Sequence, residues 1–149
     1  MIRFLLSISI LLFSSLCYSQ ALKVDGKSSY KYKMNITFSK ANISGICILR
    51  DNGEQIVGSV INEFGIKAFD FVYDKKRDKT KLANVMKLFN KWFIRRVLSS
   101  DLSCLLRVDN TKRILKKRKL CFENNETVTL ENCRYNIIYN FKLINETIE

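Results

Sequence analysis

KLANVMKLFNKWFIRRVLSSDLSCLLRV (residues 81–108) has the spacing of one long amphipathic helix. Its apolar residues recur every three or four positions: Leu82, Val85, Met86, Phe89, Trp92, Phe93 and Val97. Lys87, Lys91 and Arg95 follow one another at intervals of four and form a basic stripe on the opposite side. We expect Trp92 to be mostly buried, because a single helix with an aromatic face must pack against a sheet.

The main part of this helix is expected to end at Ser99, Ser100 and Asp101. Serine and aspartate side chains compete for backbone hydrogen bonds and favour the ends of helices. Residues 101–108 are then predicted to form a second, short helical piece.

Alternating apolar and polar residues predict strands on both sides of the helix. The expected strands are residues 30–38, 43–50, 55–62 and 66–73 before it, and 112–122, 127–130 and 134–143 after it. Asp51, Asn52 and Gly53 predict a tight hairpin with a type I′ turn. The sequence therefore predicts an α+β fold: a curved antiparallel sheet of about seven strands, four and then three, packed on one long amphipathic helix inserted in the middle.

The first 19 residues have the features of a secretory signal peptide: a short basic start, an apolar run over residues 4–16 and small residues before the exit. We expect cleavage near Ser19, which leaves Gln20 as the first residue of a secreted or periplasmic protein. Acylation of Cys17 is the less favoured alternative, because Leu16 stands where a lipoprotein signal has a small residue. Residues 20–149 are predicted to form a single domain, ordered from about 30 to 143.

The composition favours a binding protein over an enzyme. The chain has a net charge of +12 and no histidine, so the usual general base near neutral pH and the commonest metal ligand are both missing. We therefore predict no catalytic residue, no metal site and no cofactor. The positive charge indicates attraction to anionic surfaces, or alternatively serves solubility alone.

The expected strand at residues 112–122 begins with a basic run that has two interpretations. It consists of Lys112, Arg113, Lys116, Lys117, Arg118 and Lys119. These cations can meet an anionic membrane surface, or they can protect a solvated edge strand from pairing with another chain. Nucleic acid is not an expected partner, because export separates the protein from most of it.

Four cysteines follow the predicted signal peptide: Cys47, Cys104, Cys121 and Cys133. Their spacing contains no CxxC pattern and so does not favour a zinc site. In an oxidising compartment they can form disulfides, and a bridge between Cys121 and Cys133 is one possibility. Cys47 and Cys104 can equally be buried thiols.

Five aromatic residues are candidates for the wall of a ligand cavity between helix and sheet: Phe69, Phe71, Phe89, Trp92 and Phe93. Their simplest interpretation is hydrophobic core. The cavity is the alternative, because one helix does not fill the concave face of a sheet of about seven strands, and the remaining apolar surface can hold a ligand.

An exported domain with a meandering antiparallel sheet, an amphipathic helix inserted after Tyr73 and returning strands resembles the LolA/LolB-like lipoprotein carriers. The segments GSVINEFGIKAFDFVYD and WFIRRVLSSDLSCLL are also similar to small uncharacterised exported proteins of Gram-negative bacteria. The resemblance implies a curved sheet whose cavity takes the acyl chains of a lipid or lipoprotein, with the five aromatic residues at its wall. The leading hypothesis is accordingly an exported, non-enzymatic domain that holds a lipid or lipidated ligand. The alternative is a structural or protein-interaction module of the cell envelope without a ligand cavity.

Overall fold

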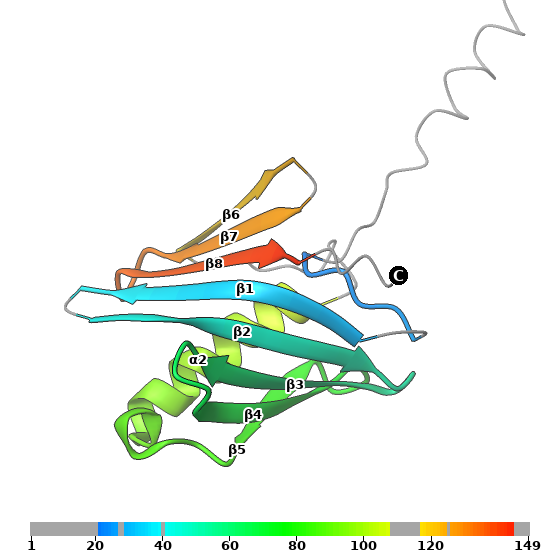
Figure 1. The fold of residues 1–149 in the computed structure, drawn as a ribbon, viewed down its shortest axis with the longest axis horizontal. Helices are drawn as coiled ribbons and strands as arrows, with labels where there is room; N and C mark the ends of the chain where they lie inside the picture. The colour runs from blue at the N-terminus through cyan, green and yellow to red at the C-terminus, as the bar shows by residue number, and fades with distance from the viewer. Residues whose placement is uncertain (1–20, 27–28, 40, 108–116, 125, 145–149) are drawn as a thin grey trace, which may run out of the picture.

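The computed structural model describes residues 21–26, 29–39, 41–107, 117–124 and 126–144 (Figure 1). In chain order these form β1 (Ser29–Phe38), β2 (Ala41–Asp51), β3 (Gln55–Asn62), β4 (Lys67–Asp74), β5 (Lys79–Ala83), the 3-10 helix η1 (Lys87–Phe89), α2 (Trp92–Leu106), β6 (Arg118–Glu123), β7 (Thr127–Asn132) and β8 (Ile137–Leu143). The predicted signal peptide and its cleavage site lie outside the described residues. No helix in the described ranges has the length and apolar character needed to cross a membrane.

All eight strands belong to one antiparallel sheet in the order β5-β4-β3-β2-β1-β8-β7-β6. The first five strands and the last three are two meanders of adjacent hairpins, and they join where β1 pairs with β8. The sheet is open, with β5 and β6 at its edges. The predicted α+β fold with an antiparallel sheet and one main helix is confirmed, with one strand more than expected.

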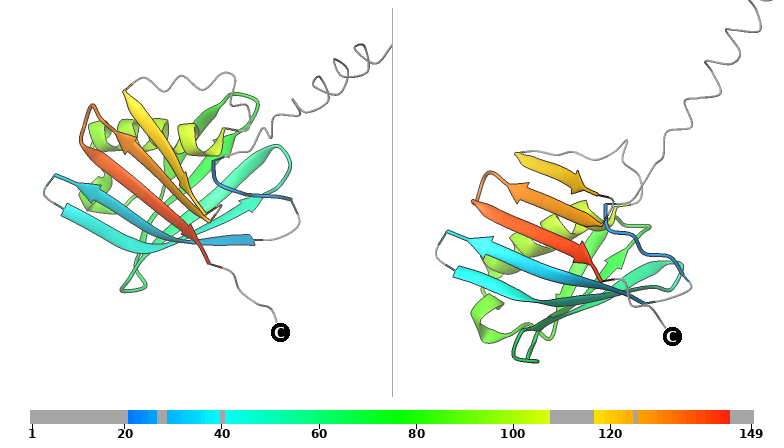
Figure 2. Two further views of the ribbon diagram at one scale, coloured as in Figure 1. Left: turned by 90° about the horizontal axis from the view of Figure 1, so that it is seen from above. Right: turned by 45° about the horizontal axis from the view of Figure 1, so that its top comes forward.

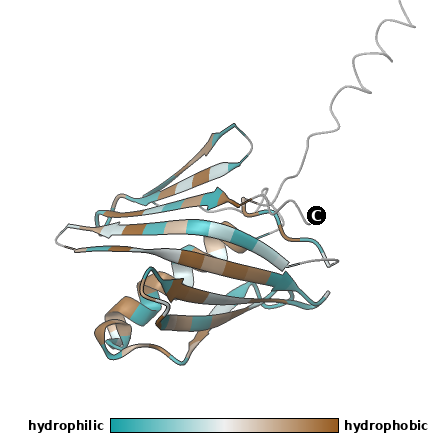
Figure 3. Ribbon diagram, viewed as in Figure 1, coloured by the Kyte–Doolittle hydropathy of each residue, from teal (hydrophilic) through white to brown (hydrophobic). Residues whose placement is uncertain are grey.

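The core lies between the sheet and α2, which crosses one face of the sheet (Figures 1 and 2). Figure 3 shows apolar and polar residues alternating along the strands, as a sheet with one covered face requires. Alternate residues of β1 and β4 are buried: Tyr32, Met34, Ile36, Phe69, Phe71 and Tyr73. Helix α2 contacts β5 and β4 on one side and β7 on the other. It therefore holds the two meanders together.

The predicted helical start at residue 81 is wrong, because Lys79–Ala83 forms β5 at the edge of the sheet. Thr80 and Leu82 point into the core while their neighbours face outward, which is the two-residue period of a strand. Asn84 then adopts a positive φ of 49°, where the chain leaves the strand. Leu82 had matched the helical spacing by coincidence.

The predicted helix end at Ser99–Asp101 is also wrong, because α2 continues through these residues to Leu106. Their polar groups find partners that leave the helix intact. The Ser103 hydroxyl donates to the carbonyl of Ser99 at 2.8 Å and accepts the backbone N–H of Thr80 at 3.0 Å. Asp101 is fully buried and accepts hydrogen bonds from the sheet. Tertiary partners here replace the capping role that the sequence favoured.

Residues 21–26, ahead of β1, pack against the core. Leu22 is fully buried in the core, and its N–H donates to the carbonyl of Leu105 at 3.3 Å. The Tyr32 hydroxyl donates to the carbonyl of Lys23 at 2.9 Å. This segment therefore packs over the C-terminal end of α2.

The hairpin between β2 and β3 occurs where it was predicted, with a different turn. Gly53 has φ +98°, and Asn52 donates its N–H to the carbonyl of Gln55 at 3.0 Å. Type I′ needs positive φ at both central residues, whereas only the first, Gly53, has it here. The turn therefore has the positive-φ pattern of type II′.

Cys121 and Cys133 are separate, exposed thiols, and no bridge joins them. The Cys133 N–H donates to the carbonyl of Lys117, so Cys133 lies opposite a residue four positions before Cys121. Four residues of extended chain cover about 13 Å, whereas a disulfide needs Cα atoms within about 7 Å. The register of β6 and β7 thus separates the two cysteines. Cys47 and Cys104 are buried cysteines outside any disulfide, as the alternative interpretation expected.

Candidate functional site

A groove of about 640 Å³ lies between α2 and the β6–β7 end of the sheet. We call it the basic groove. Its residues are Trp92, Phe93, Arg96, Val97 and Ser100 on α2, and Lys117, Arg118, Asn132, Arg134 and Tyr135 on the strand side. Its volume lies within the range of about 300–1,000 Å³ that is usual for small-molecule sites.

The helix side of the groove is a consequence of helical spacing. Trp92, Arg96 and Ser100 are four residues apart and lie along one stripe of α2. The stripe that faces the core carries Val97, Asp101 and Leu105 instead. Trp92 is 74% exposed, so the prediction that it is mostly buried is wrong. It lies in the first turn of α2, on the stripe that borders the groove and not on the one packed against the sheet.

The strand side is positioned by the pairing of β6 with β7. Arg118, the first residue of β6, pairs with Asn132, the last residue of β7. The chain then turns back, with the Tyr135 N–H donating to the carbonyl of Asn132 at 3.3 Å. The guanidinium of Arg134 lies over the ring of Tyr135, 5.3 Å from its centroid. Cations and an aromatic ring therefore alternate on this wall.

The buried side chain of Asp101, on α2, connects the helix side of the groove to the strand side through hydrogen bonds. Its carboxylate accepts hydrogen bonds from Arg118 Nε at 2.6 Å, from Asn132 Nδ2 at 3.0 Å and from the Tyr139 hydroxyl at 2.7 Å. Burial, and next the charge of Asp101, raise the pKa of Tyr139 well above its usual value. Tyr139 therefore remains a neutral donor to Asp101. The network comes from α2, β6, β7 and β8, and it fixes Arg118 against the helix.

An aromatic cluster forms the apolar part of the groove. The Phe93 and Tyr135 rings meet edge to face with centroids 5.1 Å apart, and Trp92 meets Phe93 in the same way at 6.1 Å. Phe93, Val97 and Tyr135 also border an adjoining apolar pocket of about 160 Å³, whose other lining residues are Phe38, Ser39, Ile94, Leu98 and Ile137. The basic groove thus continues into an apolar recess.

The five aromatic residues predicted to line one cavity divide into two groups. Phe69 and Phe71 are 1% exposed core residues, and the Phe69 ring packs against Phe89 with centroids 6.2 Å apart. A Cβ at Gly58 would lie 2.1 Å from the Phe71 ring, so this part of the core is full. Trp92 and Phe93 lie instead at the basic groove.

The basic run divides as well. Lys117 and Arg118 line the groove, whereas Lys119 points to the other face of the sheet, 4.0 Å from the Glu131 carboxylate. Lys112, Arg113 and Lys116 lie outside the described residues. Arg96, Arg134 and Tyr135 were not predicted as site residues. Each is a single exposed or half-exposed residue without a local motif, so the sequence offered no signal for them.

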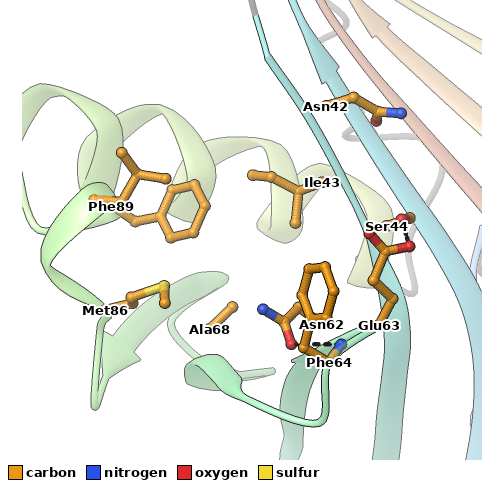
Figure 4. Close-up of a pocket in the computed structure, with 10 residues that line it drawn as sticks. Asn42, Ile43, Ser44, Asn62, Glu63, Phe64, Ala68, Met86 and Phe89 are labelled. Carbon is orange, nitrogen blue, oxygen red and sulfur yellow. Dashed lines mark hydrogen bonds between the residues drawn. The ribbon is translucent and has the colours of Figure 1, made fainter.

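A second, smaller pocket of about 170 Å³ lies between η1 and the β3–β4 turn (Figure 4). Phe89, Ala68 and Met86 line it, and the exposed Phe64 ring stands at its rim. Three of its four polar side chains, those of Ser44, Asn62 and Glu63, are already paired within the chain. Ser44 donates to Glu63 at 2.9 Å, and Asn62 Oδ1 accepts the N–H of Phe64 at 3.0 Å (Figure 4). This pocket offers a ligand less space and fewer open polar partners than the basic groove.

Asp70, an acidic residue among apolar neighbours, lies away from both cavities. It accepts hydrogen bonds from Ser59, from Asn84 at 2.7 Å and from Lys67 at 3.1 Å. Burial opposes its ionisation, but these hydrogen bonds and the Lys67 charge outweigh that effect and lower its pKa. Asp70 therefore has the surroundings of a structural carboxylate.

The basic groove combines four cations with an aromatic wall, and no acidic residue is found among the parts of its lining that the structure describes. Such a site can hold an apolar group beside a negative charge. Within the described ranges, no three His, Cys, Asp or Glu side chains are grouped closely enough to hold a metal ion. In comparisons with known proteins, no family model matches this chain and no curated protein gives a significant match.

Proposed function

We propose that this chain is a non-enzymatic binding domain that holds a lipid-like ligand in the basic groove. The observation that carries the proposal is the exposed aromatic wall in a cavity of about 640 Å³. Trp92 is 74% and Phe93 42% exposed, although large aromatic side chains ordinarily gain free energy by burial. A ligand in the groove would cover both rings.

The ligand class is that implied by the resemblance to LolA/LolB-like carriers, but the proposed location differs. The resemblance placed acyl chains against five aromatic residues, and three of them, Phe69, Phe71 and Phe89, are buried in the core. The groove and its apolar recess lie at the start of α2 instead. The proposal therefore rests on this chain's own cavity, and the resemblance remains a prediction.

The composition of the wall favours binding over catalysis. Among the lining residues that the structure describes, Ser100 has the only serine or threonine hydroxyl, and it accepts a hydrogen bond from Arg118 Nη2 at 2.9 Å. None of these described residues carries a carboxylate or a thiol, and the whole sequence contains no histidine. Activation of a nucleophile needs an adjacent base, a lowered pKa or a metal.

Uptake of a neutral apolar fluorophore tests the proposal. N-phenylnaphthylamine should bind saturably at micromolar concentration and gain fluorescence, and Trp92, the only tryptophan of the chain, should change its emission as the probe covers it. Phe93→Ala should weaken this binding. Phe64→Ala is the matched control, because Phe64 is an exposed aromatic at the other pocket.

Two results would count against the proposal. Absence of saturable uptake by the folded protein would leave the interaction module without a ligand cavity as the better hypothesis. Loss of binding in Phe64→Ala but not in Phe93→Ala would move the ligand to the pocket between η1 and the β3–β4 turn.

A further inference from the structure

We infer that the ligand of the basic groove is an amphiphile with an anionic headgroup, a carboxylate or a phosphate, and that Arg118 is the residue that selects it. This inference rests on the proposed function and specifies the class of ligand. It follows from the charges of the groove, from the way Arg118 is held, and from the contact between cations and aromatic rings.

The charges of the groove are unbalanced. Arg96, Lys117, Arg118 and Arg134 all line it, and no Asp or Glu of the described residues does. The nearest compensating group is Asp101, which is buried beneath Arg118 and pairs with it. Within the described part of the chain, Arg96, Lys117 and Arg134 form no ion pair. Like charges gathered around one cavity repel each other, and an anion relieves that repulsion.

Arg118 is held in place before any ligand arrives. Its side chain is only 16% exposed, with Nε bonded to Asp101 and Nη2 to Ser100. A guanidinium has five N–H donors, and these two bonds use two of them. The remaining donors, on Nη1 and Nη2, are unused by the described residues. An immobilised guanidinium suits the paired oxygens of a carboxylate or phosphate, because little rotamer freedom is lost on binding.

The apolar part of the ligand follows from the neighbours of these cations. Arg134 stacks on Tyr135, Tyr135 contacts Phe93, and Phe93 borders the apolar recess. Charge and apolar surface thus adjoin within one groove. A small inorganic anion would leave the aromatic wall uncovered, and a neutral hydrocarbon would leave the cations without a partner. An anionic amphiphile satisfies both parts.

The test compares ligands that share a chain and differ in the headgroup. Laurate, lauryl alcohol and laurylamine are titrated against the full protein, with Trp92 emission and calorimetry as readouts. A charged hydrogen bond contributes enough for laurate to bind about tenfold or more tightly than lauryl alcohol. Laurylamine should bind more weakly than the alcohol. Lauryl phosphate adds a phosphate headgroup on the same chain, and its affinity relative to that of laurate shows whether carboxylate or phosphate is preferred.

Two variants separate groove contacts from overall charge. Arg134→Gln should weaken the affinity for laurate about fivefold, which is the effect of losing one nearby cation. The affinity for lauryl alcohol should stay the same within about twofold. Arg77→Gln removes the same charge from the turn between β4 and β5, where the side chain is 73% exposed, and should leave laurate binding unchanged. Equal weakening by both variants would reduce the effect to net charge and overturn the inference.

Asp101→Asn tests the role of Arg118. The nearly isosteric change raises the net positive charge of the groove region, so bulk electrostatics predicts tighter laurate binding. Loss of the Asp101 contact that positions Arg118 predicts the opposite, a smaller ratio of laurate to lauryl alcohol affinity. Because this variant is also expected to lose stability, the double variant Arg118→Gln, Asp101→Asn removes both charges together and should show the same reduced ratio.

The outcomes for the two proposals are distinguishable. Equal affinity for laurate and lauryl alcohol would refute the anionic headgroup and leave the binding domain standing. Failure of every amphiphile and of the neutral fluorophore would refute both. A clear preference for laurate that Asp101→Asn strengthens would keep the anionic ligand and remove Arg118 as its selector.

Discussion

Replacing Asp101 by alanine should cause a large loss of stability, because one buried carboxylate serves donors from three strands. The substitution leaves the Tyr139 hydroxyl and the Asn132 amide, both buried, without their acceptor. An unsatisfied buried donor costs about 1–3 kcal/mol, and removing one partner of a buried ion pair costs about 3–5 kcal/mol. Since Arg118 retains some access to solvent, we expect a loss of about 3–5 kcal/mol in the free energy of unfolding.

The measurement is urea unfolding followed by far-ultraviolet circular dichroism. Tryptophan emission is a poor probe for it, because Trp92 is largely exposed in the folded state. Tyr139→Phe, which removes one donor and keeps the carboxylate, should cost about 1 kcal/mol. Combining it with Asp101→Ala should cost less than the sum of the two single changes, since the residues are in contact. A loss below about 1 kcal/mol for Asp101→Ala would contradict the view that this network joins α2 to the sheet.

Three further predictions follow from burial and charge. Trp92→Ala should lower the free energy of unfolding, measured by heat or urea, by only about 1–1.5 kcal/mol. About a quarter of the side chain is covered, out of an aromatic area of about 150–250 Å², and each buried Å² contributes about 25 cal/mol. A loss of about 3–5 kcal/mol would mean that the ring is buried. Iodoacetamide at mildly alkaline pH should label Cys121 and Cys133 in the folded protein and spare Cys47, because burial raises the pKa of Cys47 to about 12. Rapid labelling of Cys47 would contradict its place in the core. Asp70→Asn should lower the free energy of unfolding near neutral pH, and the difference from the unsubstituted protein should shrink on acidification below about pH 4. The reason is that a carboxylate whose pKa is lowered in the folded state stabilises the protein above its unfolded pKa of about 3.9 and stops doing so as it is protonated. A stability difference that is independent of pH between about 2 and 7 would contradict this.

The strands were predictable because their residues alternate strictly. The third strand was predicted at residues 55–62, which are the bounds of β3, and Phe69, Phe71 and Tyr73 share the buried face of β4 as expected. The helix was less predictable. Leu82 and Phe89 fit a helical spacing, but the positive φ of Asn84 and the pairing of β5 with β4 interrupt it. Strand pairing is a tertiary interaction, and it overrides local periodicity.

The site was predicted in fragments. Trp92 and Phe93 were assigned to a cavity and Lys117 and Arg118 to a basic surface, and the structure brings all four to one groove. The cause is the contact of Arg118 with Asp101, which depends on how β6 packs against α2. No local pattern of sequence specifies that contact.

The central position of β1 has a consequence for how the chain reaches its folded state. β1 pairs with β2, its neighbour in sequence, and with β8, where Tyr32 lies opposite Leu143. As the chain is synthesised from its N-terminus, the first meander can form early. The backbone of β1 that pairs with β8 stays unpaired until residues 137–143 have been made. Such long-range pairing is slow, and an open edge is a template for pairing with other molecules. β1 also carries Lys31 and Lys33, and charged side chains in a strand oppose its stacking with other molecules before β8 is available.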